Sequence, residues 1–330
     1  KRVKIAQNNN RNNRMNEIKS FLKNLNSFDL VVIVFFFLLT IINIIYCNRV
    51  EQWLIFICLN TCIISLVFLI AFIENKSDKE AWHIIHYWYV APLVVITFKE
   101  IYFMIKPIRQ MDYDYLFIQI DRWLFGTDPT HFLYQFSHPI ITETLQIVYG
   151  TFYLLPIMLG VFLYRKKRYL AMDYAVFSII YGFYISYLGY FALPGIGPRF
   201  TLHNFSTINE FLPGLFLTNI LREIVNIGES IPAGTINPAD LVQRDVFPSG
   251  HTMITLIVMY LSVRLRSRSR YFFVPVGSLL IVATVYLWYH YVIDLIAGFA
   301  FMVFSVWSGK IIFNWWRRKT GKEEFEYNKA

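Results

Sequence analysis

About eight long runs of hydrophobic residues, almost free of charge, are each close to the length that a helix needs to cross a bilayer. The runs are Leu30–Cys47, Trp53–Ile73, Ala81–Ile105, Leu145–Tyr164, Tyr174–Leu193, Phe247–Val263, Tyr271–Tyr289 and Val292–Trp316. Lys99 and Glu100 interrupt the third run, and Asp294 and Lys310 lie near the two ends of the last. Within lipid, only a helix satisfies its own backbone over such runs. We therefore predict an all-α fold, a polytopic membrane helix bundle.

The positive charge of the chain is concentrated in clusters. The net charge is +9, and the sequence is 56% hydrophobic, too apolar for an ordinary soluble domain. Basic residues gather in the N-terminal segment, at Arg165–Arg168, at Arg264–Arg270 and at Trp315–Lys322. Counting the runs places these clusters on one side, which the positive-inside rule makes cytoplasmic, together with both termini. We interpret them as topology signals that contact anionic lipid headgroups, and we expect no nucleic acid partner.

The chain divides into four expected segments. They are a disordered, Asn- and Lys-rich cytoplasmic tail (1–27), the N-terminal spans with an interfacial segment (28–142), a membrane core (143–316) and a second cytoplasmic tail (317–330). Met15 is a candidate start of the protein. Asp114–Phe136 is too polar to span a bilayer and too apolar to lie free in water. It therefore predicts interfacial helices on the extracytoplasmic side.

A long loop, Pro194–Val246, follows the fifth run. A loop of this length is usually functional. Its middle, Ile208–Val225, is amphipathic. Two interpretations remain open: the segment is a lid on the membrane surface, or it is a passive surface helix.

The first candidate site residues open the sixth run, at Ser249, Gly250 and His251. A helix N-terminus offers unpaired N–H groups and a partial positive charge, which together attract anions. A glycine there lets a phosphate approach the backbone. The simpler interpretation is that Ser249 only caps the helix and that His251 is a solvated interfacial histidine.

His290 and Asp294 are spaced to meet on one helix face, and Arg199 lies in an irregular turn, LPGIGPRF. A carboxylate that holds Nδ1–H of a histidine leaves Nε2 free as a nucleophile. A guanidinium can clamp a phosphate with two hydrogen bonds. The alternatives are a structural His–Asp pair and an arginine that reaches lipid headgroups. All of these residues fall on the extracytoplasmic or lumenal side of the predicted topology.

The motif Pro248–His251, the spacing of His290 and Asp294, and the preceding arginine turn resemble the type-2 phosphatidic acid phosphatase superfamily, which also includes vanadium haloperoxidases. The resemblance covers roughly residues 142–316, the expected catalytic core. It implies that His290 is the nucleophile that forms a phosphohistidine. It also implies that Asp294 orients His290, that His251 is the general acid, and that Ser249, Gly250 and Arg199 bind the phosphoryl oxygens.

The sequence departs from the family's pattern in two cations. Ala192 stands where the first motif has a lysine, Thr284 stands where the third motif usually has an arginine, and the expected Arg-Pro order is reversed at Pro198 and Arg199. Arg244 is a candidate substitute for one missing cation. The string HYVID, the stretch 115–126 and the GPRF turn resemble inositol phosphorylceramide synthases, and HYVID also resembles sphingomyelin synthases.

The sequence thus predicts an integral-membrane lipid phosphotransferase that moves a phosphate or phospho-headgroup from a lipid to an alcohol or lipid acceptor. The alternative is a lipid phosphate phosphatase that uses water, and minor alternatives are a non-catalytic binding protein and a transporter. No acidic cluster flanks the histidines, and Cys47, Cys58 and Cys62 lack metal-site spacing. We therefore expect no metal and no cofactor.

Overall fold

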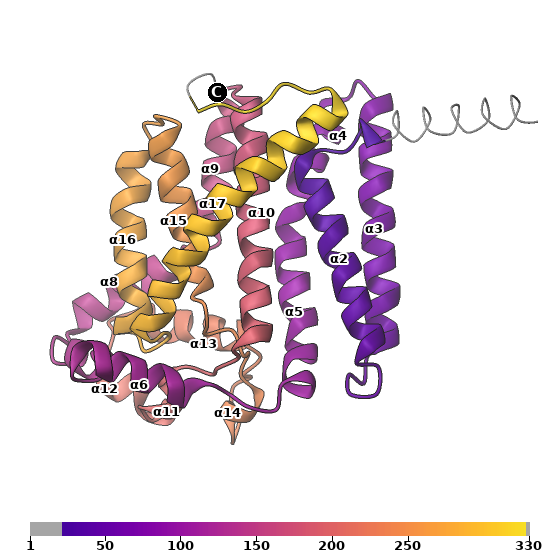
Figure 1. Ribbon diagram of the computed structural model, residues 1–330. Helices are drawn as coiled ribbons and strands as arrows, with labels where there is room; N and C mark the ends of the chain where they lie inside the picture. The colour runs from indigo at the N-terminus through magenta and orange to yellow at the C-terminus, as the bar shows by residue number, and fades with distance from the viewer. Residues whose placement is uncertain (1–21, 328–330) are drawn as a thin grey trace, which may run out of the picture.

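The computed structural model describes residues 22–327, and within them every regular element is a helix (Figure 1). Met15 and most of the expected N-terminal tail lie outside the described residues. The bundle contains α2 (Ser27–Ile45), α3 (Trp53–Lys76), α4 (Glu80–Trp88), α5 (Val90–Ile108), α8 (Pro139–Gly150), α9 (Leu154–Arg165), α10 (Tyr169–Ala192), α15 (Gly250–Arg264), α16 (Arg270–Tyr286) and α17 (Val292–Thr320). The all-α prediction is confirmed.

Each hydrophobic run of the sequence corresponds to a helix or a pair of helices in the bundle. Five stretches in the described part of the chain are long and apolar enough to cross a membrane: α2, α3, α4 with α5, α10 and α17. The pair α8 and α9 makes a sixth if its 55° bend is counted within one span. The hairpin helices α15, with 15 residues, and α16, with 17, are shorter. These helices are consistent with a multi-pass membrane protein.

Helix α10 lies at the centre of the bundle. It packs against α2, α5, α9, α15 and α17, and its side chains Tyr174, Tyr184 and Tyr187 are fully buried. The α15–α16 hairpin lies on one side of α10 and α2 and α3 lie on the other, while α17 crosses α10 diagonally (Figure 1). This packing brings the N-terminal ends of α15 and α17 together, because α15 also packs against α17.

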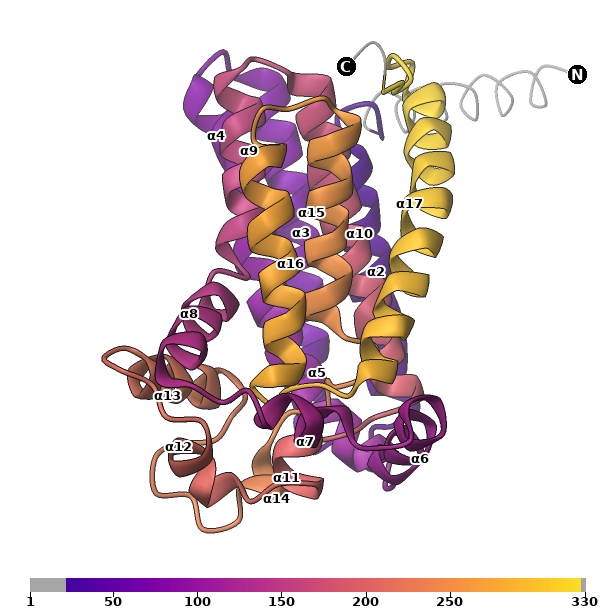
Figure 2. The same ribbon diagram turned by 90° about the vertical axis from the view of Figure 1, so that its left-hand side faces the viewer.

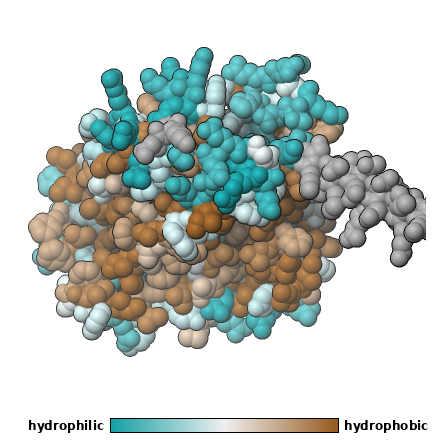
Figure 3. Space-filling view, turned by 45° about the horizontal axis from the view of Figure 1, so that its top comes forward, coloured by the Kyte–Doolittle hydropathy of each residue, from teal (hydrophilic) through white to brown (hydrophobic). Residues whose placement is uncertain are grey.

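The two ends of the bundle differ in character. One end carries the basic turns 165–168 and 264–270 and the end of α17, whereas short helices gather at the other (Figures 1 and 2). These are α6 (Asp114–Phe125), α7 (Pro129–Tyr134), α11 (Pro198–Thr201), η1 (Phe205–Thr207), α12 (Ile208–Phe211), α13 (Thr218–Gly228) and α14 (Pro238–Leu241). Figure 3 shows hydrophilic residues gathered at the basic end above a broad hydrophobic zone.

The expected segment boundaries fall within ordered structure. Residues 142 and 143 lie inside α8, and α17 continues to Thr320. Beyond α17, Phe325 is fully buried and stacks on Tyr174, with ring centres 4.0 Å apart. The four-segment division stays a prediction.

Candidate active site

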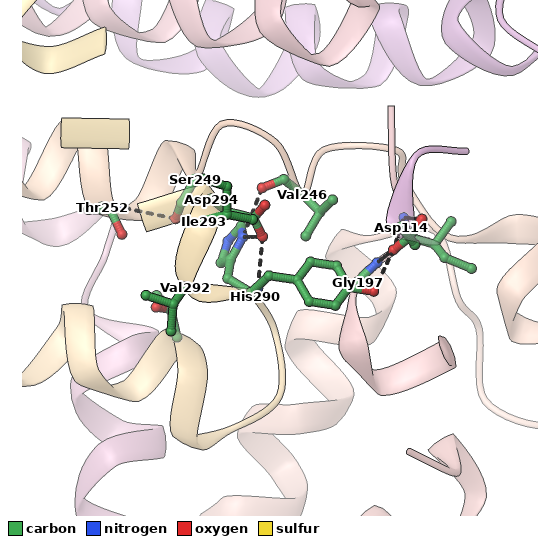
Figure 4. Close-up of polar contacts among 12 residues, drawn as sticks. Asp114, Gly197, Val246, Ser249, Thr252, His290, Val292, Ile293 and Asp294 are labelled. Atoms are coloured by element: carbon green, nitrogen blue, oxygen red, sulfur yellow. Dashed lines mark hydrogen bonds and ion pairs between the residues drawn. The ribbon is translucent and has the colours of Figure 1, made fainter. Parts of the chain in front are cut away.

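His290 follows α16 and is held by two acceptors (Figure 4). Its Nδ1 atom lies 3.0 Å from the carbonyl oxygen of Val246 and 3.4 Å from Oδ2 of Asp294. Because a carbonyl oxygen can only accept, Nδ1 carries the proton and Nε2 of the neutral ring is free. Asp294 in turn accepts the backbone N–H of Tyr291 at 2.8 Å, which fixes the carboxylate in the first turn of α17.

Asp294, the predicted partner of His290, is therefore one of two groups that contact its Nδ1 atom. The sequence assigned the orienting role to Asp294, whereas the shorter contact comes from the backbone of Val246. The two histidine rings lie near one another, with centres 5.7 Å apart. The ring of His251 also packs against Tyr149 and Phe152, at 4.6 Å and 4.2 Å between centres. Its nitrogens make no hydrogen bond to another residue that the structure describes.

Ser249 caps α15. Its hydroxyl accepts the backbone N–H of Thr252 at 3.2 Å, and its own N–H donates to the carbonyl of Asp294 at 3.0 Å. Ser249 is thus the N-cap of α15, and the same contacts tie the starts of α15 and α17 together. Its predicted role in binding phosphate stays a prediction. A side chain at Gly250 would meet the hydroxyl of Tyr190 at 2.4 Å, so this glycine is needed for close packing against α10.

The arginine turn is built on Gly197, whose φ of +93° suits only glycine and whose missing side chain would meet the Tyr289 carbonyl at 2.9 Å. The next helix, α11, places Arg199 so that its guanidinium lies 4.6 Å from the ring centre of Tyr289. One guanidinium nitrogen donates to Asn226 at 2.9 Å, and another forms a short ion pair with Glu229. Arg199 is therefore buried and links this turn to the end of α13.

Two carboxylates on α6, those of Asp114 and Asp121, accept hydrogen bonds from the segments that form the candidate site. Asp114 accepts the N–H groups of Ile196 and Gly197 and the hydroxyl of Tyr291, at 2.7–3.2 Å. Asp121 accepts the first N–H groups of α17, those of Val292 and Ile293, both at 2.8 Å. Burial raises the pKa of both carboxyl groups, and these hydrogen bonds oppose the rise.

A cavity of about 410 Å³ lies beside His251. Its lining includes the charged or titratable side chains of Lys99 from α5, Glu229, Asp245 and His251, four tyrosines, and Gly250 at the start of α15. The remaining walls come largely from aromatic and aliphatic side chains of α5, α8, α10 and α13. His290 is not among the residues that line this cavity and is only 4% exposed.

Burial sets the charge of the groups around the site. It lowers the pKa of His290 to about 3, so the ring is neutral at physiological pH, as a nucleophile must be. Burial and the neighbouring Glu229 raise the pKa of Asp245 well above its usual range. Burial also raises the pKa of Glu229, against the lowering effect of Arg199.

The structure does not bring Arg244 to the histidines. Its guanidinium donates to the carbonyls of Ala239, Asp240 and Val242 and contacts Asp112 at 3.4 Å. These contacts hold it to the α14 loop, outside the cavity lining. The cation that does enter the cavity is Lys99, whose amine donates to Gly228 and Ser230.

Sequence reasoning missed Lys99, Asp114, Asp121, Glu229 and Asp245. A signal existed for Lys99, because a lysine within a hydrophobic run is costly in lipid and usually functional. Asp114 and Asp121 are seven residues apart, which places both on one face of α6. Among the described residues, no group of three or more His, Cys, Asp or Glu side chains is arranged to hold a metal ion.

The model of one protein family matches residues 116–308, more than half of the chain, and that family is described as the PAP2 superfamily. This chain belongs to the PAP2 superfamily, whose type-2 phosphatidic acid phosphatases the sequence motifs resemble. The match is to the superfamily and does not assign the inositol phosphorylceramide synthase branch. No curated protein and no solved structure matches the chain. Membership supports a lipid phosphatase or phosphotransferase type of function.

Proposed function

We propose that this protein is a lipid phosphotransferase that moves a phosphate or phospho-headgroup from a lipid to an alcohol acceptor through a phosphohistidine at His290. The observation that carries the proposal is the pairing of two histidines at one end of the bundle. One has its Nδ1 proton fixed by Val246 and Asp294, and the other lines an adjacent cavity.

In the first step, Nε2 of His290 attacks phosphorus and the bond to the leaving oxygen breaks, while His251 gives that oxygen a proton. In the second, the acceptor hydroxyl loses its proton to His251, its oxygen attacks phosphorus and the bond to His290 breaks. Phosphoryl transfer depends mainly on placement and on neutralising charge. Arg199 and Lys99 supply cations, and the backbone at Ser249 and Gly250 supplies the positive end of α15.

The cavity supports transfer to an alcohol rather than to water alone. Its volume of about 410 Å³ exceeds the need of one water molecule. The carboxyl groups of Asp245 and Glu229 offer acceptors for hydroxyl groups, and α13 forms one wall. A wall that closes over the acceptor would keep water scarce during transfer. The second candidate is a lipid phosphate phosphatase, in which water takes the place of the acceptor in the same cavity.

We also propose a sidedness for this multi-pass protein. The basic turns at Arg165–Arg168 and Arg264–Arg270 lie at the end of the bundle opposite the histidines. The positive-inside rule then places both termini in the cytoplasm and the site at the extracytoplasmic or lumenal face.

Trapping of a phosphoenzyme tests the chemistry. Purified protein is quenched during turnover of a labelled lipid phosphate, and the label is mapped by mass spectrometry. We expect phosphohistidine at His290, no trapped label in His290→Ala, and slow label accumulation in His251→Ala from a substrate with a good leaving group. Labelled phosphohistidine that persists in His290→Ala would overturn the assignment. A protein that never releases or transfers phosphate would be a non-catalytic member of the family.

Product analysis with and without added alcohols separates the two candidate reactions. Capture of the phosphoryl group by an alcohol or lipid acceptor supports transfer. Rapid release of free phosphate, with no capture by any acceptor, supports the phosphatase instead.

A further inference from the structure

Aromatic rings enclose the imidazole of His251. Tyr149 stacks on it, with ring centres 4.6 Å apart and planes inclined by 22°, and the ring centre of Phe152 lies 4.2 Å away. Both aromatic side chains are buried. The orientation of a histidine ring is often set by a hydrogen bond to one of its nitrogens. Within the described part of the chain His251 makes no such bond, so the two aromatic rings take over this task.

The break between α8 and α9 brings both rings to His251. Tyr149 is the last residue but one of α8, and Phe152 lies in the short break before α9 begins at Leu154. The N–H group of Phe152 donates to the carbonyl oxygen of Tyr149 at 3.2 Å, which holds the two residues in one turn. The 55° bend of the chain therefore lies at the residues that enclose His251.

Tyr149 also makes contact through its second face. Tyr289 stacks on it with ring centres 4.3 Å apart and planes inclined by 11°. One face of a ring cannot take two parallel rings at these distances, so Tyr289 and His251 occupy opposite faces of Tyr149. The guanidinium of Arg199 lies 4.6 Å from the ring centre of Tyr289. Tyr149 thus lies between His251 and the ring that contacts Arg199.

We propose that Tyr149 is a positioning residue for His251, which is the general acid of the proposed function on which this inference rests. The tyrosine ring sets the plane of the imidazole and leaves both nitrogens free for the leaving oxygen and, later, the acceptor hydroxyl. The face of an aromatic ring also attracts a cation, so Tyr149 favours the protonated form of His251. Both effects come from the ring and neither needs the tyrosine hydroxyl.

The leaving group distinguishes this role from simple packing. An alcohol that leaves from a lipid phosphate needs a proton from the general acid, whereas a nitrophenolate is stable enough to leave without one. A badly placed His251 should therefore slow the first reaction much more than the second. A general loss of packing around the site would slow both reactions alike.

The test compares Tyr149→Leu, Tyr149→Phe and the control Tyr181→Leu. Tyr181 also stacks on an aromatic ring, that of Phe177, and does not line the cavity. The rate of phosphoenzyme formation is measured at saturating phosphatidic acid and at saturating para-nitrophenyl phosphate. In Tyr149→Leu we expect the ratio of the first rate to the second to fall about tenfold or more. In Tyr149→Phe and Tyr181→Leu the ratio should not change.

His251→Ala supplies the ratio for a protein without this acid. A ratio that falls in His251→Ala and stays constant in Tyr149→Leu would overturn the positioning role. An equal fall in Tyr149→Phe would also overturn it, because the hydroxyl would then carry the effect. If Tyr149→Leu does not fold in detergent, Phe152→Leu replaces it, and a constant ratio there would count against the enclosing rings.

Failure of the proposed function gives a different result. If the unmodified protein forms no phosphoenzyme, or if His251→Ala has the same ratio as the unmodified protein, His251 is not the general acid. The proposed mechanism is then refuted, and the role of Tyr149 is refuted with it.

Discussion

Arg199 shares its guanidinium between α13 and the aromatic rings around it. It donates to Asn226, pairs with Glu229 and lies over the ring of Tyr289. Asn226 and Glu229 each take one N–H group of the guanidinium, which leaves its other N–H groups for a phosphate. The arginine is thus presented in a fixed geometry before the substrate arrives, which favours bidentate contact.

Replacing Arg199 with lysine should keep the charge and lose the bidentate geometry. We expect Arg199→Lys to lose roughly 2–3 kcal/mol of transition-state stabilisation, measured as kcat/KM on a lipid phosphate. Arg49→Lys, on an exposed arginine between α2 and α3, is the matched control and should retain activity. Chelators should not change either rate. Loss of activity with a chelator and recovery with magnesium would contradict a reaction driven by protein cations alone.

At the scale of single residues, the sequence identified the side chains of the candidate site better than the groups that these side chains contact. The spacing of His290 and Asp294 predicted their contact. The expected reason was wrong, because His290 precedes Tyr291, the N-cap of α17, and does not share a helix face with Asp294. Sequence reasoning missed the carbonyl of Val246, which every residue type carries and which comes from 44 positions away. It also missed Glu229, whose pairing with Arg199 depends on how the loop after α11 folds back.

Helix α6 supports the candidate site through hydrogen bonds that two of its carboxylates accept. Asp114 fixes the arginine turn, and Asp121 fixes the N-terminus of α17, which carries Asp294. A carboxylate at a helix N-terminus also interacts favourably with the helix dipole. The sequence predicted helix in this segment, which the structure confirms, and its interfacial location stays a prediction. Its role as a support appeared only with tertiary contacts.

Removing the charge of Asp121 should loosen α17. In Asp121→Asn the amide oxygen can still accept one of the two N–H groups, but the amide NH₂ group then faces the other donor. We therefore expect the free energy of unfolding to fall by about 1–2 kcal/mol. We expect kcat to fall as well, because Asp294 loses its fixed position. Thermal unfolding in detergent and turnover of a lipid phosphate measure the two effects.

The matched control for this prediction is Asp128→Asn. Asp128 pairs with Arg122 in the same region, and within the described part of the chain it makes no hydrogen bond or ion pair with α17. Its loss should change kcat little. Equal kcat in Asp121→Asn and the unmodified protein would show that α17 keeps its position without this carboxylate.

Hydrophobic runs predicted where helices occur and failed to show where they break. The run 145–164 reads as one span, yet α8 ends at Gly150 and α9 begins at Leu154. Pro156 explains the break in part, because it has no N–H to donate to the carbonyl of Phe152. The direction and size of the bend depend on neighbouring helices and are not encoded in a local pattern.

For the whole molecule, the basic turns predict which end faces the cytoplasm. In a background without Cys47, Cys58 and Cys62, single cysteines are placed at two exposed positions, Glu210→Cys and Arg268→Cys. In intact cells or oriented vesicles, an impermeant thiol reagent should label the first and not the second. Labelling after permeabilisation confirms that both cysteines can react. The reverse pattern would place the histidines at the cytoplasmic face.

All the elements that form the site lie at one end of the bundle (Figure 1). A lipid phosphotransferase of the proposed kind, with its site at one end, would draw on the lipids of a single leaflet. Charged headgroups cross a hydrocarbon core only at high cost. In a sealed vesicle the reaction would therefore stop after the accessible leaflet is consumed, with the other half of the pool untouched. Continued turnover in a cell would depend on the rate at which other proteins move its substrate across the membrane.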